Sequence, residues 1–442
     1  MRLSYKKLFS FIHDKSQRLI LYYIVVAAMM FYFMRPGISV SMPKRIVMLG
    51  LIVAPIITNL RLLPTVLLMF VGADNASFVH VLPVTDWYYL VIVLAFYALY
   101  RNKSSLFLKE LAIFSYFYVS AIYFYDVPKC FIWMGVGIVL CDMINNKQDL
   151  RLLFHGFLFM TIFLGILFLL YHNDFNHQEI LVSQNGETEE VLERTGWANF
   201  NVFGSFMAAG GVLAISYITG VLKFRNSNFS MVISVTTAVV AIVVLALNAS
   251  RGAAVAFIVP SLFLFLVSNS KLYVKLLFLF VVVMLFYWLY IHNMFDVLSA
   301  RMENDTVNTA GGRTDIWRAK LYQFFYTLTP RERLFGIGQK GCLTLAIYFS
   351  THNDYLTALI AYGFIGFGLF TYFVLVHPIL KGGRKKLLPI IGLLLYLVIE
   401  GVVVEPFFRG YFVEIMFYFF VLKYALLDDI ENESSIRVPT NK

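Results

Sequence analysis

Shortages of charged residues and of cysteine narrow the class of protein before any motif does. Only 14% of the 442 residues are charged, whereas soluble domains average about 25%. Because 60% are hydrophobic, a single soluble core could not enclose the apolar surface. The three cysteines, Cys130, Cys141 and Cys342, form no CxxC pair and no metal-ligand spacing, so neither a disulfide framework nor a structural zinc site is indicated. The composition therefore indicates a polytopic membrane protein.

The net charge of +10 does not indicate nucleic-acid binding, because the basic residues fall in short clusters between apolar segments. Such clusters are typical of the cytoplasmic loops of inner membrane proteins. The basic N-terminus precedes the apolar run 19–34, which ends without a small-residue cleavage signal. We therefore predict that this run is a retained first span.

The apolar segments have the lengths expected of membrane helices, which need about 20 residues. The candidate spans are 19–34, 86–100, 105–125, 128–144, 151–171, 199–222, 230–249, 252–268, 271–291, 355–376, 386–404 and 409–427. Arg61 and Pro64 divide the interval 45–72, which leaves two thin spans, a re-entrant hairpin or one broken helix. We predict an all-α polytopic membrane protein with about 12–14 transmembrane helices and a larger periplasmic loop that contains short surface helices.

Charge predicts which side each linker faces. The basic linkers, such as 147–151 and 381–386, should be cytoplasmic, whereas the glutamate-rich stretch 173–193 should face outward. Alternation then places 249–252, 292–354 and 405–409 outside and both termini inside. The predicted regions are N-terminal transmembrane helices (1–171), a periplasmic loop (172–198), central transmembrane helices (199–291), the main periplasmic loop (292–354), and C-terminal transmembrane helices with a cytoplasmic tail (355–442).

A polar cluster heads the predicted span 355–376. Here Thr351 and His352 are followed directly by Asn353, Asp354 and Tyr355. A lone histidine at a helix start is more often structural than functional. A helix N-terminus favours bound anions, however, and the three residues after the histidine could orient a sugar hydroxyl or the imidazole.

Arginines are predicted to reach the same membrane face from separate loops. Arg251 occupies a very short turn between two apolar helices, Arg313 follows two glycines at the start of a predicted surface helix, and Arg194 ends the glutamate-rich loop shortly before Asn201. An arginine in such a place is costly unless it meets an anion or water. The alternatives are a snorkelling Arg251 and contact of Arg313 and its basic neighbours Arg318, Lys320, Arg331 and Arg333 with lipid phosphates.

Two further segments of the main outer loop have recognisable patterns. Apolar residues between Ile316 and Leu328 recur at helical spacing, which predicts a helix on the membrane surface that Pro330 stops. The segment Gly336 to Gly341 matches GxGxxG but follows no buried strand, so we predict turns and no dinucleotide site.

These motifs together resemble the O-antigen ligase and polymerase superfamily. His352-Asn353, nine residues and Gly363-Phe364-Ile365-Gly366 are similar to the H-N-x9-G-x-x-G signature of the O-antigen ligases. Other pieces follow in the family's order, namely Arg194-Thr195-Gly196 with Asn199 and Asn201, Ser250-Arg251-Gly252, Gly312-Arg313 with Trp317, and Leu334-Phe335-Gly336-Ile337-Gly338. The resemblance covers roughly residues 190–410.

The resemblance implies a metal-independent, inverting glycosyltransferase of the membrane-embedded GT-C type in the inner membrane. It would act at the periplasmic face on a glycan attached to undecaprenyl pyrophosphate, without a cofactor. Arg251 and Arg313 would bind the pyrophosphate and His352 would activate the acceptor hydroxyl. This chemistry requires fixed positive charge at a leaving group and a base with a pKa near neutrality. Arg194, Asn201, Asn353, Asp354 and Tyr355 are candidate substrate-binding residues.

The sequence leaves three functions open. We favour an O-antigen ligase, which transfers glycan to lipid A core in lipopolysaccharide biosynthesis, because the H-N-x9-G-x-x-G match is complete. A polymerase joining two lipid-linked repeats would need the same donor site. A transporter or flippase for lipid-linked sugars could use the same arginines, but such proteins commonly have two related halves and a mid-membrane site. We find no internal repeat, and the polar residues are predicted to gather at one face.

Overall fold

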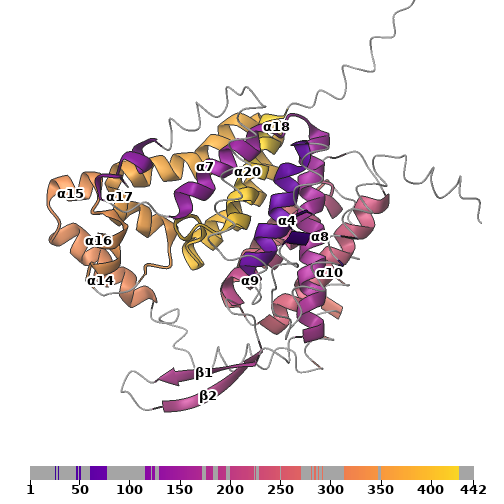
Figure 1. Ribbon diagram of the computed structural model, residues 1–442, viewed down its shortest axis with the longest axis horizontal. Helices are drawn as coiled ribbons and strands as arrows, with labels where there is room; N and C mark the ends of the chain where they lie inside the picture. The colour runs from indigo at the N-terminus through magenta and orange to yellow at the C-terminus, as the bar shows by residue number, and fades with distance from the viewer. Residues whose placement is uncertain are drawn as a thin grey trace, which may run out of the picture.

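The computed structural model describes residues 60–76, 115–120, 122–124, 129–171, 176–182, 188–195, 200–222, 228–248, 250–269, 313–346 and 350–427, with a few isolated positions elsewhere. The predicted spans 19–34, 86–100 and 271–291 lie outside these ranges apart from isolated positions, as does part of 105–125. The described residues form a helical assembly, which confirms the predicted all-α membrane fold (Figure 1).

The helices follow the apolar runs of the sequence. They are η1 (Leu60–Leu62), α4 (Leu63–Ala76), α7 (Lys129–Asp142), α8 (Lys147–Tyr171), α9 (Phe200–Ile218), α10 (Asn228–Asn248), α11 (Arg251–Val267), α14 (Arg313–Tyr326), α15 (Pro330–Phe335), α16 (Gly338–Thr344), α17 (Asp354–Thr371), η4 (Tyr372–Val376), α18 (His377–Val403), α19 (Pro406–Arg409) and α20 (Phe412–Leu426). Among the described residues, four stretches are long and apolar enough to cross a membrane: Lys147–Tyr171, Asn201–Ile218, Asn228–Asn248 and Asp354–Val403. In the divided interval 45–72, η1 contains Arg61 and leads directly into α4, which contains Pro64 and runs on to Ala76, while residues 51–59 lie outside the described part of the chain.

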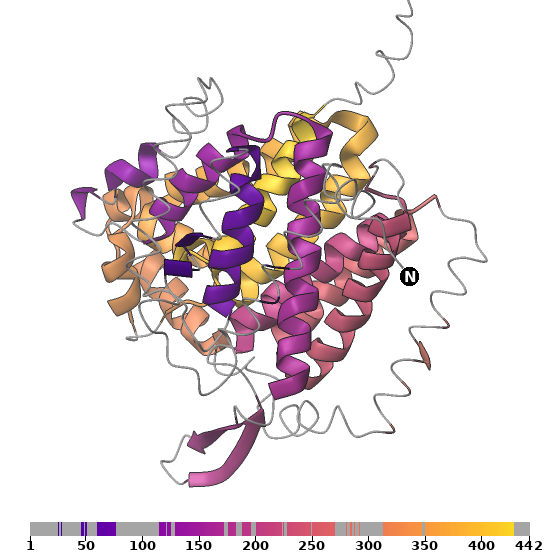
Figure 2. The ribbon, with the colours of Figure 1, turned by 45° about the vertical axis from the view of Figure 1, so that its right-hand side comes forward.

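One hairpin interrupts the helical pattern. Strands β1 (Asn176–Val182) and β2 (Thr188–Thr195) pair antiparallel within the predicted outer loop 172–198. The hairpin lies at the bottom of the view in Figures 1 and 2, apart from the helices. The sequence pattern did not predict a strand in this loop.

Helix α9 packs centrally because small residues line it. It contacts α8, α10 and α11. A Cβ atom on Gly210 would collide with Thr161 of α8, and one on Gly211 would meet Phe257 of α11 and Ala241 of α10. Small residues let neighbouring backbones approach closely in membranes, and Gly210 and Gly211 allow this close packing of α9.

The two C-terminal spans are bent at glycines. Gly363 (φ 69°) interrupts α17, and Gly383 (φ 61°) interrupts α18 within the basic linker 381–386. The chain turns back within this stretch, since Thr357 near the start of α17 donates to Glu405 just after α18. This break agrees with the predicted linker between the spans 355–376 and 386–404.

Gly363 belongs to the GxxG part of the motif, and its role is structural. A Cβ atom there would collide with the Leu334 carbonyl oxygen, because the chain around α15 rests against the kink. Gly363→Ala is expected to lower the stability by about 3 kcal/mol, through a glycine-only backbone conformation and overpacking. The apparent melting temperature in detergent measures this effect.

Gly368 provides the matched control for this prediction. It lies in the same helix, and an added methyl group there would have nothing within 4 Å, so Gly368→Ala should be neutral or stabilise by up to about 1 kcal/mol. Equal melting temperatures for the two variants would contradict the assigned role of Gly363.

The outer-loop helices differ from expectation in two places. Helix α14 begins at Arg313 as predicted, but Lys320 is fully buried and its Nζ donates to the carbonyl oxygens of Cys342 (2.5 Å) and Leu345 (3.0 Å). Lys320 therefore connects α14 to the end of α16, and the alternative in which it contacts lipid phosphate is wrong. The expected turns over 336–341 are also partly wrong, because α16 begins at Gly338.

Candidate active site

One end of the helical assembly gathers the predicted site segments. Ser250 Oγ, just before α11, donates to Asn201 Oδ1 near the start of α9 (3.1 Å). Trp317 of α14 donates through Nε1 to the Thr351 carbonyl oxygen (2.6 Å). At the opposite end, Lys386 donates to the Tyr424 carbonyl oxygen (3.1 Å). The segments predicted to face outward thus meet at one end, and a lysine from a predicted cytoplasmic linker lies at the other.

The segment 350–353 presents the histidine ahead of α17. Asn353 is the N-cap residue, and its side-chain oxygen accepts from the Leu356 N–H (3.0 Å). His352 has a left-handed backbone (φ 51°), a conformation uncommon for residues other than glycine. Strained residues persist only where surrounding contacts hold them. Contacts of this segment must therefore hold His352 in its left-handed conformation.

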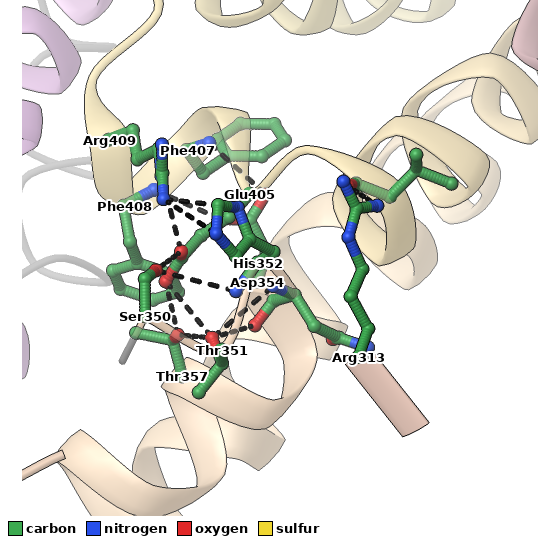
Figure 3. Close-up of polar contacts among 12 residues, drawn as sticks. Arg313, Ser350, Thr351, His352, Asp354, Thr357, Glu405, Phe407, Phe408 and Arg409 are labelled. Atoms are coloured by element: carbon green, nitrogen blue, oxygen red, sulfur yellow. Dashed lines mark hydrogen bonds and ion pairs between the residues drawn. The ribbon is translucent and has the colours of Figure 1, made fainter. Parts of the chain in front are cut away.

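Asp354 is fully buried and ties α17 to α19. Its two carboxylate oxygens accept from the backbone N–H groups of Phe407 (3.1 Å) and Phe408 (3.0 Å) (Figure 3). A carboxylate is a favourable partner for the unpaired N–H groups at a helix start. These contacts favour a positioning role for Asp354 over contact with a substrate.

Glu405 connects the same two segments through its side chain. It lies between α18 and α19 in a left-handed conformation (φ 64°) and is only 5% exposed. Its carboxylate accepts from Ser350 Oγ (2.5 Å), Thr351 Oγ1 (3.2 Å) and Thr357 Oγ1, and pairs with Arg409 Nε (3.4 Å). A carboxylate offers about four acceptor positions, and four donors fill them here.

Arg409 lies against the imidazole of His352. Its Nη2 atom is 3.1 Å from Nδ1 and 3.4 Å from Nε2, and Figure 3 draws His352 between Arg409 and Arg313. Burial lowers the pKa of His352 to about 4, and the positive charges of Arg409 and Arg313 contribute. The sequence-based expectation was a pKa near neutrality, whereas burial and, after it, the two guanidinium groups oppose protonation of the ring and lower its pKa.

Removing one of these charges should raise the pKa of His352. Arg409→Gln is expected to move it from about 4 toward the ordinary value of about 6.5, so that protonation of the ring begins at higher pH. Histidine-selective NMR measures this titration, with the His352 signal assigned by its loss in His352→Gln. Arg318→Gln, on the exposed side of α14, is the control and should leave the titration unchanged. An unchanged titration in Arg409→Gln would contradict the electrostatic assignment.

Arg313 and Arg251 both begin helices beside the end of α18. Arg313 Nη1 donates to the Val403 carbonyl oxygen (2.6 Å). Arg251 is the first residue of α11, and a Cβ atom on the next residue, Gly252, would collide with the Val403 side chain. The Arg313 side chain and the backbone beside Arg251 therefore lie at the end of α18, two residues before Glu405.

The remaining predicted residues are placed differently. Tyr355 packs its ring on Phe370 with centroids 5.7 Å apart, and Asn201 bonds to Ser250 as described, so both lie among helices. Arg194 belongs to β2, where it is in register with His177, and its side chain lies outside the described part of the chain. The prediction that Arg194 lies near the histidine therefore remains a prediction.

Sequence reasoning missed Glu405, Arg409 and the hydroxyls that bind Glu405. A signal was present, because Glu405-Pro406-Phe407-Phe408-Arg409 puts an acid and an arginine in a short predicted outer loop. The same argument that singled out Arg251, a charge between two apolar helices, applies equally to Arg409.

Comparison with known proteins identifies a family over part of the chain. Residues 236–371 match the family model described as O-antigen ligase. This confirms the resemblance to the O-antigen ligase and polymerase superfamily. The match extends from α10 to the end of α17 and includes Arg251, Arg313 and His352, but not Glu405 or Arg409. No curated protein and no solved structure matches the chain.

Proposed function

We propose that this chain, which matches the O-antigen ligase model over residues 236–371, is an inverting, metal-independent glycosyltransferase. It moves a glycan from undecaprenyl pyrophosphate onto a sugar hydroxyl at the periplasmic face of the bacterial inner membrane. The acceptor we favour is lipid A core, as in an O-antigen ligase. The observation that carries the proposal is the imidazole of His352 between the guanidinium groups of Arg409 and Arg313.

The proposed reaction is a single displacement. The acceptor oxygen attacks the anomeric carbon, the bond from that carbon to the pyrophosphate oxygen breaks, and the acceptor proton passes to His352. Arg313 and Arg251 stabilise the negative charge that grows on the leaving pyrophosphate, for which a planar and permanently charged guanidinium is well suited.

The low pKa of His352 fits this reaction once the donor is considered. The neutral ring that a base requires predominates at pH 7, because the pKa is about 4. A base with so low a pKa is weak. A bound pyrophosphate would offset the positive charges of Arg409 and Arg313 and so raise the pKa of His352. The imidazole would therefore become a stronger base only when the donor is in place.

Neighbouring side chains have positioning roles in this proposal. Asn353 caps α17 behind the histidine, Asp354 holds α19, and Glu405 holds both Arg409 and the segment that carries His352. None of these three needs to contact the reacting atoms.

Two alternatives make different predictions. A polymerase would use a second lipid-linked repeat as the acceptor, with the same donor site. A transporter would need an anion path through the membrane, whereas the arginines and the histidine of this chain gather at one end of the helices. That gathering favours a transferase over a transporter.

The deciding experiment uses the purified full-length chain with undecaprenyl-pyrophosphate glycan. Lipid A core is offered in one reaction and a second lipid-linked glycan in another, and the products are analysed by mass spectrometry. Extension of lipid A core supports the ligase, whereas extension of the lipid-linked glycan indicates the polymerase. If glycan is transferred to neither acceptor, the transferase proposal is wrong.

A further inference from the structure

A small cavity lies beside the histidine on the Arg409 side. Its volume is about 240 Å³, which is below the roughly 300–1,000 Å³ of pockets that enclose drug-sized ligands. Residues of α16 and of the segments 350–357 and 405–409 line it: Gln339, Lys340, Cys342, Leu343, Ser350, Thr351, Thr357, Glu405, Phe408 and Arg409. A space of this size suits one ring of a larger molecule.

The chemistry of the lining indicates a polyhydroxylated ring. One wall carries three hydroxyls whose positions Glu405 fixes, and the charge of Glu405 is paired with that of Arg409. The remaining surface includes the apolar Leu343. Hydroxyl groups both donate and accept hydrogen bonds, so this wall suits sugar hydroxyls.

Gln339 supplies an amide with unused capacity. Its Nε2 atom is buried and has no hydrogen-bond partner among the residues that the structure describes, although buried polar groups are normally paired. Gln339 lines the cavity, so a ligand oxygen there could accept from it. This unpaired donor is an observation independent of the cavity shape.

The position of the cavity distinguishes acceptor from donor. Arg409 both lines the cavity and contacts His352, whereas Arg313 and Arg251 lie at the end of α18, and neither lines the cavity. In an inverting displacement, the attacking oxygen and the leaving pyrophosphate approach the anomeric carbon from opposite sides. The pyrophosphate belongs with Arg313 and Arg251, so the cavity lies where the attacking sugar would enter.

We infer that this cavity is the acceptor subsite, which holds the terminal sugar ring whose hydroxyl attacks the donor. The inference rests on the proposed function but is independent of the choice between ligase and polymerase, since both accept onto a sugar. Gln339 donates to a ring substituent, and the Glu405 hydroxyl network sets the orientation of the ring.

Two variants test the subsite in the transfer assay. Leu343→Trp fills the cavity and Gln339→Leu removes the unpaired donor while keeping the side-chain size. Each is expected to raise the KM for the acceptor about tenfold, the effect of one lost hydrogen bond or blocked contact, with the KM for the donor unchanged. Leu334→Trp, at an exposed position of α15 outside the cavity, is the matched control.

The outcomes separate this inference from the proposed function. If the wild-type chain transfers glycan but both variants leave the acceptor KM unchanged, or raise the donor KM in its place, the subsite is overturned and the transferase stands. If Leu343→Trp fails to fold, Gln339→Leu alone decides. A wild-type chain that transfers to no acceptor overturns the proposed function, and this inference with it.

Discussion

His352→Ala is expected to reduce glycan transfer by about 10²- to 10⁴-fold, the range typical of a lost general base. The lipid-linked donor should remain on the outer leaflet, because its delivery does not depend on this chain if the chain is a transferase. Transfer is measured with saturating donor and acceptor in proteoliposomes, and the leaflet by accessibility of the glycan to an added lectin.

The same variant discriminates the transporter alternative. A flippase that loses its anion-handling residue would leave the donor on the inner leaflet, inaccessible to the lectin, and that result would contradict the transferase. His377→Gln is the control histidine, since it lies beyond the Gly363 kink where its ring packs near Phe373. It should retain transfer near the wild-type level.

Glu405→Ala is expected to lower activity at least about 100-fold and stability by about 3 kcal/mol, because it removes a buried, fully bonded carboxylate. Three hydroxyls lose their acceptor, and Arg409 loses its ion pair beside His352. The transfer assay and the melting temperature in detergent measure the two losses separately.

Glu405→Gln refines this second prediction. The amide keeps one oxygen acceptor but places two N–H donors where other donors already point, so an intermediate loss is expected. Asp315→Asn, an exposed acid on α14, is the control and should change neither quantity. A Glu405→Ala chain with normal activity would show that the carboxylate does not position the imidazole.

The helices were predictable because apolar length alone selects a membrane span. Alternation of the spans predicted that the loops of Arg251, Arg313 and His352 lie at the same face of the membrane. These steps need only the order of apolar and charged segments. They do not depend on side-chain contacts.

The remaining parts of the site depend on such contacts. Glu405 lies 53 residues after His352 in the sequence, and its importance comes from four donors that meet only in the folded chain. The low pKa of His352 follows from its burial and the closeness of two guanidinium groups, and the burial of Lys320 from three carbonyl groups at the end of α16. A single sequence shows which residues are present but not the distances between them in the folded chain.

The hydrogen bonds of Asp354 and Glu405 limit where this protein can be truncated. The family match ends at residue 371. Glu405 and Arg409, which hold His352 and its segment in place, come after that point, beyond α18. A fragment truncated at that boundary would retain the diagnostic motif and lose its scaffold. If the proposed function holds, the smallest active fragment must therefore extend through α19.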